Sequence, residues 1–82
     1  MVFYVYILEC ADGTLYTGWT NNLDKRVAAH NAGRGARYTR MHRPVKLVYW
    51  ENYATRSLAQ RREAAIKRMR RAAKLGLISN FG

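Results

Sequence analysis

Cysteine, acidic residues and long apolar runs are all scarce in this chain. The one cysteine, Cys10, can form no intramolecular disulfide and has no second cysteine at the spacing of a zinc site. Because it ends an apolar run, we expect it to be a small buried hydrophobe. The run 2–8 is far too short to cross a bilayer, and no charged-then-apolar signal precedes it. These absences predict a reduced, cytoplasmic protein with no membrane partner.

Negative charge is the second shortage. The chain has 5 acidic residues against 15 lysines and arginines, which gives a formal net charge of +10, and 11 of those 15 are arginine. Such an excess is typical of proteins that bind a polyanion, and forked guanidinium groups favour bidentate contacts to phosphate. The composition therefore predicts a nucleic-acid partner. A merely soluble or ribosomal-type basic surface stays open as the alternative.

Apolar patterning and turn residues divide the chain into strands and helices. The run 2–8 is dense in aromatic and β-branched residues, which predicts a strand buried on both faces. Asp12-Gly13 is a hairpin signal, so the next strand should return beside the first. The expected elements are, in order, strand 2–8, strand 14–18, a helix capped by Asn21 or Asn22 that runs to about Asn31 and stops at Gly33, a loop or short helical turn over 33–44, strand 45–53 after Pro44, a long helix capped by Thr55 or Ser57 and ended by Gly76, and a short tail at 77–82.

This β-β-α-β-α order predicts one domain, residues 1–82, of the α+β class. We expect a small three-stranded antiparallel sheet flanked by helices, an α/β sandwich-like arrangement in which the third strand can pair with either hairpin strand. The last helix should turn an apolar stripe inward, with the stem of an arginine among the stripe residues. The stripe is Leu58, Arg62, Ala65, Ile66 and Met69.

Helical spacing puts two chemically active side chains on the first helix. Arg26 and His30 lie beside the apolar stripe of Leu23 and Val27 and should face the sheet. A guanidinium aimed at a sheet is costly unless it meets a charge or lines a cleft. Arg26 could instead pair with Glu9 or Asp12, and His30 could bind a backbone carbonyl, so two interpretations remain at this point.

The last helix and the arginine-rich segment hold the other candidates. Glu63 is the only acid among eight bases between 56 and 74, and it could hold one hard cation or simply pair with Lys67. Four arginines recur at every third position of the glycine-rich segment and could follow a phosphate backbone. A solvated basic loop is the alternative. These arginines are Arg34, Arg37, Arg40 and Arg43.

Taken together, these residues resemble the GIY-YIG nuclease superfamily, most closely its small single-domain bacterial members (UPF0213-like) and the related structure-specific endonuclease subunits. The resemblance covers essentially the whole chain. Tyr4 and Thr17 depart from the motifs, where the family has glycine and isoleucine. The matching positions are Tyr4-Val5-Tyr6, Tyr16-Thr17-Gly18, Arg26, His30, Gly35-Ala36-Arg37-Tyr38-Thr39, Arg43-Pro44, Glu63 and the late Asn80.

The resemblance implies metal-assisted hydrolysis of a phosphodiester. Tyr6 would act as general base or position the water, with Tyr16 in support, and a phenol of pKa about 10 predicts cleavage that rises toward alkaline pH. Arg26 would stabilise the phosphoryl charge, and His30 would orient a tyrosine or assist proton transfer. Glu63 would hold a single Mg²⁺ or Mn²⁺.

Three functions are therefore to be separated. The first is a DNA endonuclease active in repair, which selects branched or nicked DNA by structure rather than sequence, because 82 residues leave no separate recognition domain. RNA is not excluded as substrate, and a protein partner is possible. The second is a non-catalytic DNA- or RNA-binding module of the same fold. The third is a structural component of a ribonucleoprotein.

Overall fold

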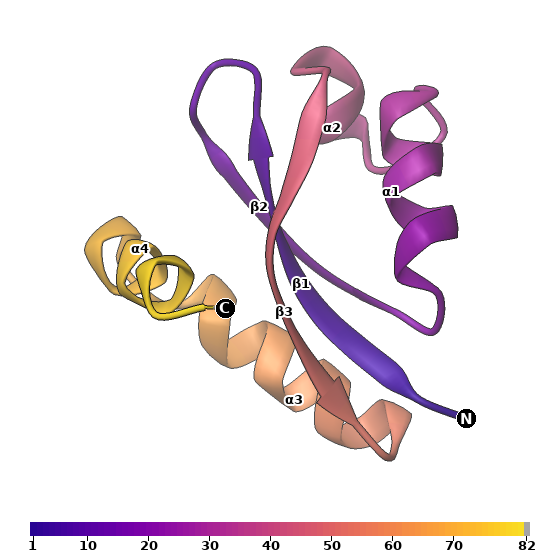
Figure 1. Cartoon of the computed structure of the whole chain (residues 1–82), viewed down its shortest axis with the longest axis vertical. Coiled ribbons are helices and arrows are strands. Elements are labelled where there is room, and N and C mark those ends of the chain that lie inside the picture. Colours follow the sequence, from indigo (N-terminus) through magenta and orange to yellow (C-terminus); the bar gives the residue numbers. More distant parts are fainter. Residues whose placement is uncertain (82) are drawn as a thin grey trace.

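The computed structural model describes residues 1–81. The three predicted strands and both long helical regions are present, and a short helix occupies the segment between the first helix and the third strand. The elements are β1 (Phe3–Cys10), β2 (Leu15–Thr20), α1 (Leu23–Asn31), α2 (Arg37–Met41), β3 (Val45–Tyr53), α3 (Arg56–Lys67) and α4 (Arg71–Ser79). The predicted α+β class, with a three-stranded antiparallel sheet and flanking helices, is confirmed (Figure 1).

The strand order is β2-β1-β3, and both pairings are antiparallel. The third strand therefore pairs with β1 rather than with β2, and β1 is the central strand. This placement explains its composition, because a central strand is covered on both faces and must be apolar on both. Val5, Tyr6, Ile7 and Leu8 are all buried, as the continuous apolar run predicts.

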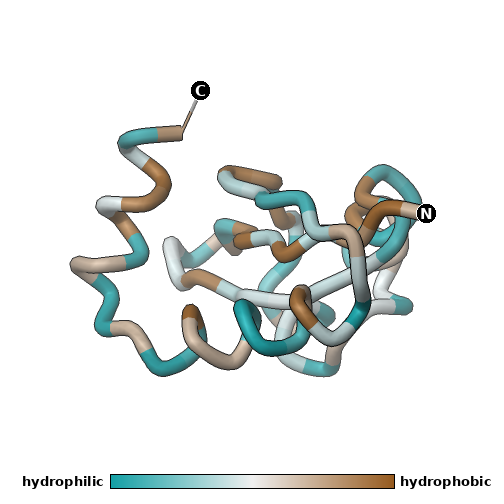
Figure 2. The backbone as a smooth tube through the Cα atoms, turned by 90° about the horizontal axis from the view of Figure 1, so that it is seen from below, coloured by the Kyte–Doolittle hydropathy of each residue, from teal (hydrophilic) through white to brown (hydrophobic). Residues whose placement is uncertain are grey.

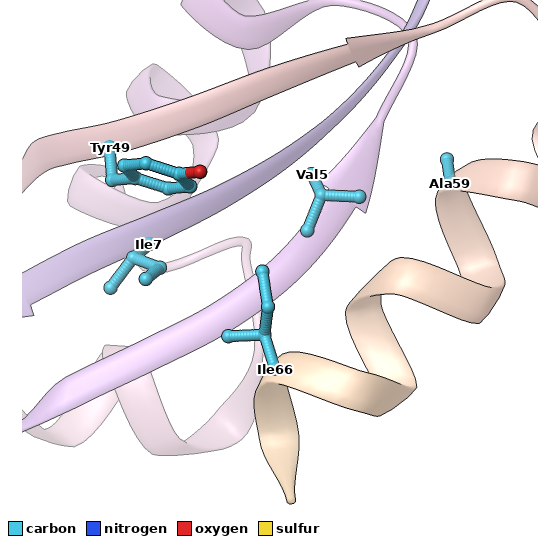
Figure 3. Close-up of a cluster of buried hydrophobic side chains, with 5 residues drawn as sticks. All are labelled: Val5, Ile7, Tyr49, Ala59 and Ile66. Carbon is cyan, nitrogen blue, oxygen red and sulfur yellow. The ribbon is translucent and has the colours of Figure 1, made fainter. Parts of the chain in front are cut away.

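Helices cover both faces of the sheet (Figure 1). On one face Val5 and Ile7 pack with Tyr49, and α3 adds Ala59 and Ile66, so that α3 and the sheet share one core (Figure 3). On the other face the alternate residues of β1 pack against α1. These residues are Tyr6, Leu8 and Cys10, with Val45, Leu23 and Val27 beside them. Cys10 is a buried free thiol, as expected.

The first helix begins where the sequence indicates. Asn22 is its N-cap, and its side chain accepts a hydrogen bond from the backbone N–H of Lys25 at 3.1 Å, which satisfies one of the free N–H groups of the first turn. Asp24 adds a negative charge in that turn, where the helix dipole favours it. The helix ends at Asn31, and its last turn carries His30 toward the sheet.

The last helical region differs from the prediction. It is two helices, broken at residues 68–70, and Gly76 lies inside α4 rather than after it. The segment 77–79 is therefore helical and not a tail, while Gly82 lies outside the described residues. A glycine costs a helix only about 1 kcal/mol relative to alanine, which neighbouring residues can offset.

The start and the inward face of α3 also needed correction. Thr55 is the N-cap, since its hydroxyl accepts from the N–H of Leu58 at 3.2 Å, and Ser57 is already helical. Leu58 is 45% exposed, so it does not belong to the inward stripe. Ala59 takes that place, and Ile66, seven residues later, is buried with it against the sheet.

A half-buried carboxylate fastens α3 to the sheet. Glu51 of β3 accepts hydrogen bonds from Nε and a terminal nitrogen of Arg62, at 2.9 and 3.0 Å, and from the phenols of Tyr49 and Tyr53. Burial works against the charge of Glu51, but Arg62 and the two phenols outweigh it and lower the pKa of this carboxyl. Burial, together with the Glu51 carboxylate, raises the pKa of Tyr49 to about 12 against the opposing charge of Arg62. We call this group the Glu51 clamp.

The outermost elements are less deeply packed. No residue of α4 is buried, and Figure 2 shows brown and teal segments alternating along this end of the chain. Within residues 1–81, no helix is long and apolar enough to cross a membrane.

Candidate active site

Tyr6 and Tyr16 are brought to the same face of the sheet by the hairpin. Tyr6 pairs with Gly18 across the strands, and Tyr16 pairs with Leu8. The absence of a side chain at Gly18 is what admits the Tyr6 phenol, because a Cβ there would collide with its oxygen and ring. The phenol therefore passes over β2 to the α1 side of that strand. This is a physical reason for a glycine at the end of the second motif.

The phenol of Tyr6 lies between the two predicted residues of α1. Its oxygen is 3.0 Å from Nε2 of His30 and 3.4 Å from Nε of Arg26. Tyr6 is 1% exposed and His30 is fully buried. Neither of the open alternatives from the sequence is found: Arg26 donates to a phenol rather than to Glu9 or Asp12, and His30 contacts side chains rather than a carbonyl.

The hydrogen bonds of Thr39 indicate which nitrogen of His30 carries the hydrogen. Nδ1 lies 2.6 Å from the Thr39 hydroxyl, which itself donates its only proton to the carbonyl oxygen of Ala36 at 2.9 Å. The hydroxyl can then only accept from His30, so Nδ1 carries the hydrogen and Nε2 is the free acceptor that faces Tyr6. Gly35 makes room for this contact, since a Cβ at that position would collide with the imidazole.

Burial sets the protonation of both groups. Loss of hydration and the charge of Arg26 lower the pKa of His30 to about 4, so the imidazole is neutral at ordinary pH. Burial raises the pKa of Tyr6, while the hydrogen bond and charge of Arg26 pull it down. A neutral phenol thus donates to a neutral imidazole, and the guanidinium stands beside the oxygen on which charge would develop.

Aromatic rings continue from the cluster toward the surface. Tyr16 meets His30 edge-on with ring centroids 5.3 Å apart, and it faces the nearly parallel ring of Tyr38 at 6.4 Å. Tyr38 stacks on His42 at 4.3 Å, and His42 lies 3.4 Å from the Asp12 carboxylate. This row joins α2 to the hairpin and holds Thr39 in place behind His30.

Glu63 lies on α3, the helix that covers the other face of the sheet from α1. Its charge is the weakest of the influences that raise the pKa of Tyr6, and no hydrogen bond joins it to Tyr6, Arg26 or His30 among residues 1–81. The side chain is 20% exposed, and its one ion pair is with Lys67 at 3.6 Å. Among residues 1–81, no three His, Cys, Asp or Glu side chains gather as a metal site. A single carboxylate suits one hard cation that keeps several waters and takes phosphate oxygens as its other ligands.

The four loop arginines do not act alike. Arg34, Arg37 and Arg40 are exposed, and within the described part of the chain none of them forms an ion pair. Arg43 instead donates to the carbonyls of Arg40 and Asn31, at 3.1 and 3.4 Å, and so closes the loop on itself. The first three guanidinium groups are therefore free for a phosphate backbone.

Tyr4 and Asn80 lie away from the Tyr6 cluster. Tyr4 lines a hollow with Asn21, Asn52 and Trp50. Asn80 caps α4 and lines another hollow between that helix and β3. The structure gives neither residue a contact with Tyr6, Arg26 or His30 among the hydrogen bonds of the described residues.

Sequence reasoning missed Thr39 and Gly35 as parts of the site. Both stand in the segment 35–39, which the resemblance singles out, but no local pattern shows that a threonine will meet a histidine nine positions earlier. The Glu51 clamp was missed for the same reason. A lone acid in an aromatic strand was the available signal.

Comparison with known proteins shows the family and the fold of this chain. The family described as the GIY-YIG catalytic domain matches residues 2–75. A UPF0213 protein of Clostridium perfringens is 60% identical over 77 residues, which are 94% of this chain and 83% of that protein. One from Syntrophus aciditrophicus is 59% identical and covers 92% and 87% of the two chains. The solution structure of a UPF0213 protein from Bacillus halodurans superposes with a TM-score of 0.62 at 43% identity, covering 96% of this chain and 84% of the other.

Proposed function

The chain belongs to the GIY-YIG nuclease family, and from that premise we propose that it is a metal-dependent endonuclease that hydrolyses phosphodiester bonds in DNA. The observation that carries the proposal is the placing of the Tyr6 oxygen between a free imidazole nitrogen and a guanidinium, at 3.0 and 3.4 Å. That arrangement suits the activation of a water molecule beside a bound phosphate.

The proton path uses residues of this chain. A water attacks phosphorus and gives a proton to the Tyr6 oxygen while the phenol gives its own proton to Nε2 of His30. The bond from phosphorus to the leaving oxygen breaks, that oxygen takes a proton from solvent water, and His30 returns its proton to solvent. Thr39 holds the other imidazole nitrogen throughout. The imidazole of the free protein is a weak base, because burial and then the charge of Arg26 lower its pKa. A phosphate bound to Arg26 offsets the second of these two causes and so favours a proton on His30.

Arg26 and Tyr16 have supporting roles in this proposal. The Arg26 guanidinium already touches the Tyr6 oxygen through Nε, so its terminal nitrogens can meet the charge that develops on the phosphoryl oxygens. Tyr16 packs against the edge of His30 and keeps the ring from turning. Arg26 thus acts on the substrate phosphate, and Tyr16 keeps the His30 ring in position.

Glu63 is the residue that would hold Mg²⁺ or Mn²⁺. The chemistry that the cation supplies when bound is polarisation of the phosphate and stabilisation of the leaving oxygen. Glu63 is half-buried, and within residues 1–81 its ion-pair partner is Lys67. Its Lys67 pair is exposed, and such pairs contribute at most a few tenths of a kcal/mol, so it is easily opened.

We further propose that the chain acts as one domain and selects DNA by shape, as nicked or branched structures. Exposed Arg34, Arg37 and Arg40 offer contacts to phosphates, which position a nucleic acid without reading its sequence directly. A cytoplasmic role in repair would suit such selection.

The decisive experiment is a cleavage panel. Labelled branched, nicked, intact duplex, single-stranded and RNA substrates are incubated with Mg²⁺, Mn²⁺ or EDTA and the wild type, Tyr6→Phe, Glu63→Gln or Lys67→Ala. We expect metal-dependent cleavage that is strongest on branched or nicked DNA and is lost in the first two variants, while Lys67→Ala, which keeps the carboxylate, stays active. Cleavage that survives in Glu63→Gln would contradict the proposed metal ligand.

The ion pair between Glu63 and Lys67 also favours a second candidate, a non-catalytic binding module, because an ammonium group occupies the carboxylate. In that case the wild type binds DNA or RNA but shows no cleavage above background with either metal. Lys67→Ala, which removes the ion pair, would then still show no cleavage above background.

A further inference from the structure

Two hollows meet at Arg26 on the outer edge of β2. One, of about 340 Å³, is lined by Trp19, Thr20, Asn21, Arg26 and Arg56. The other, of about 240 Å³, is lined by Thr20, Asn21, Asn22, Lys25, Arg26 and Ala29. Because they share Thr20, Asn21 and Arg26, the two hollows adjoin at the arginine whose Nε lies beside the Tyr6 oxygen, and we treat them as one depression. We call the part that contains Arg56 the Arg56 hollow.

The charge in this depression has one sign. Arg26, Lys25 and Arg56 line it, and no acidic side chain of residues 1–81 does so. Across the same range, neither Arg26 nor Arg56 forms an ion pair. Positive groups that share a hollow repel each other, and an anion between them removes that cost. The depression therefore favours an anionic occupant on both sides of Arg26.

Arg56 is held ready for such a contact. Its guanidinium carbon lies 5.6 Å from the centroid of the Trp19 ring, and Trp19 is itself supported by Phe3 at 6.3 Å. A guanidinium above an indole is oriented by the ring while its N–H edge stays free to meet a phosphate. Arg56 is also the first residue of the 12-residue helix α3, where the helix dipole adds to the attraction for an anion.

We propose that the Arg56 hollow binds the phosphate adjacent to the scissile one in the nucleic-acid backbone. The inference rests on the proposed function, which puts the scissile phosphate at Arg26. A strand whose reacting phosphate meets Arg26 has its next phosphate within the same depression, and Trp19 with Arg56 is the group it meets there. The hollow thus fixes the register of the strand at the reacting atoms, whereas Arg34, Arg37 and Arg40 line neither part of the depression.

The test measures binding and cleavage separately. DNA binding in EDTA is followed by fluorescence anisotropy over a salt series for the wild type, Arg56→Ala and the matched control Arg61→Ala, an exposed arginine of the same helix that lines neither hollow. We expect Arg56→Ala to reduce the slope of log K against log salt by about 0.9, the value for one phosphate contact, and to weaken binding roughly tenfold at low salt. Arg61→Ala should keep the wild-type slope within about 0.3.

A second arm identifies the phosphate. A single uncharged methylphosphonate is placed in turn at each backbone position of the same DNA, and the variants are compared on every duplex. One position beside the cleaved bond should weaken the wild type as much as Arg56→Ala does, and at that position Arg56→Ala should cause no further loss. Equal losses at every position, or a slope equal to that of Arg61→Ala, would overturn the assignment.

A third arm separates a nucleic-acid backbone from free phosphate. In a Trp50→Phe background, Trp19 is the remaining tryptophan and reports on the hollow. DNA should change its fluorescence, whereas inorganic phosphate at the same total phosphate concentration should not; saturation by inorganic phosphate would overturn the assignment to DNA. If the wild type binds as expected but cuts nothing with Mg²⁺ or Mn²⁺, the endonuclease proposal fails while the hollow stands. If it cuts and Arg56→Ala binds normally, only the hollow is wrong.

Discussion

The hydroxyl of Thr39 lies 2.6 Å from Nδ1 of His30, and this contact decides which imidazole nitrogen carries the hydrogen. Because the hydroxyl spends its proton on Ala36, it accepts from the imidazole and leaves Nε2 unprotonated. Thr39 is thus a positioning residue in the second layer of the site. It acts on the phenol only through the histidine.

Replacing Thr39 with valine removes the acceptor while keeping the shape. We expect the cleavage rate to fall about 10- to 100-fold, as for other changes of the group that orients a reacting histidine. Nitrogen NMR of His30 should show loss of the Nδ1–H tautomer, a change that mere loosening of the fold would not cause. Thr39→Ser should restore both the tautomer and the rate. A normal tautomer in Thr39→Val would contradict the hydrogen-bond assignment.

The pH dependence of cleavage should report on His30. With a pKa of about 4 in the free protein, the acid limb of kcat/KM is expected near that pH. The limb of kcat should lie higher, because the bound phosphate neutralises Arg26. Burial raises the pKa of Tyr6. We therefore expect the rise of the cleavage rate toward alkaline pH only in His30→Gln, in which the phenol has lost its acceptor. A wild type and variant with the same profile would exclude His30 from the proton path.

The same residue should make the fold sensitive to acid. An unfolded histidine gains a proton as pH falls through about 6.5, whereas folded His30 resists it until about 4. Stability is therefore present above 6.5 and declines between these two values, by roughly 3 kcal/mol in all. Urea unfolding at pH 7, 5.5 and 4 measures the decline. His30→Gln should flatten this part of the curve, and an unchanged slope would count against the lowered pKa.

Two glycines give opposite predictions for the same substitution. Gly18→Ala puts a Cβ against the Tyr6 phenol, which should cost about 1–3 kcal/mol of stability and abolish cleavage. Gly76→Ala meets nothing within 4 Å inside α4 and should stabilise the protein by roughly 0.5–1 kcal/mol without loss of activity. Thermal unfolding and the cleavage assay of the two variants test this contrast. A harmless Gly18→Ala would mean that the phenol can move aside.

Thr17 offers a gain in stability. It is 4% exposed, and its hydroxyl finds no hydrogen-bond partner among residues 1–81. Thr17→Val should therefore raise the free energy of unfolding by about 1–2 kcal/mol, because an unpaired buried hydroxyl is removed. Thr14→Val is the matched control, since its hydroxyl donates to Asp12 at 2.6 Å and its loss should destabilise the hairpin. Destabilisation by Thr17→Val would indicate a hidden partner.

Local patterns predicted the strands, the hairpin and the cap of α1 because each depends on residues close in sequence. The continuous apolar run predicted a strand buried on both faces, although which hairpin strand would be central stayed open, and Asn22 was one of two predicted caps. The break in the last helical region had no such signal, since residues 68–70 contain neither proline nor glycine. Leu58 followed helical spacing but faces solvent, because the position of α3 on the sheet is set by tertiary contacts.

The candidate site divides in the same way. Tyr6, Arg26 and His30 could be grouped from motif spacing and helical periodicity, and the structure brings them into contact. Their second layer could not, because the Thr39 contact depends on how α2 folds back on α1, and the Arg56 hollow joins the edge of β2 to a helix far along the chain. Charge counting gave equal weight to four loop arginines, although Arg43 is used within the loop.

The Glu51 clamp affects how any mutational survey of this protein should be read. Arg62, which binds Glu51, is the immediate neighbour of Glu63, so this anchor and the proposed metal ligand share one turn of α3. Changing Glu51 or Arg62 leaves the other residue as a partly buried charge without its partner and lets this turn of α3 shift. Cleavage would then fall although neither residue contacts DNA. A screen that scores activity alone would count both as members of the site. Only a parallel measurement of metal affinity at Glu63 separates the support from the residue that it holds.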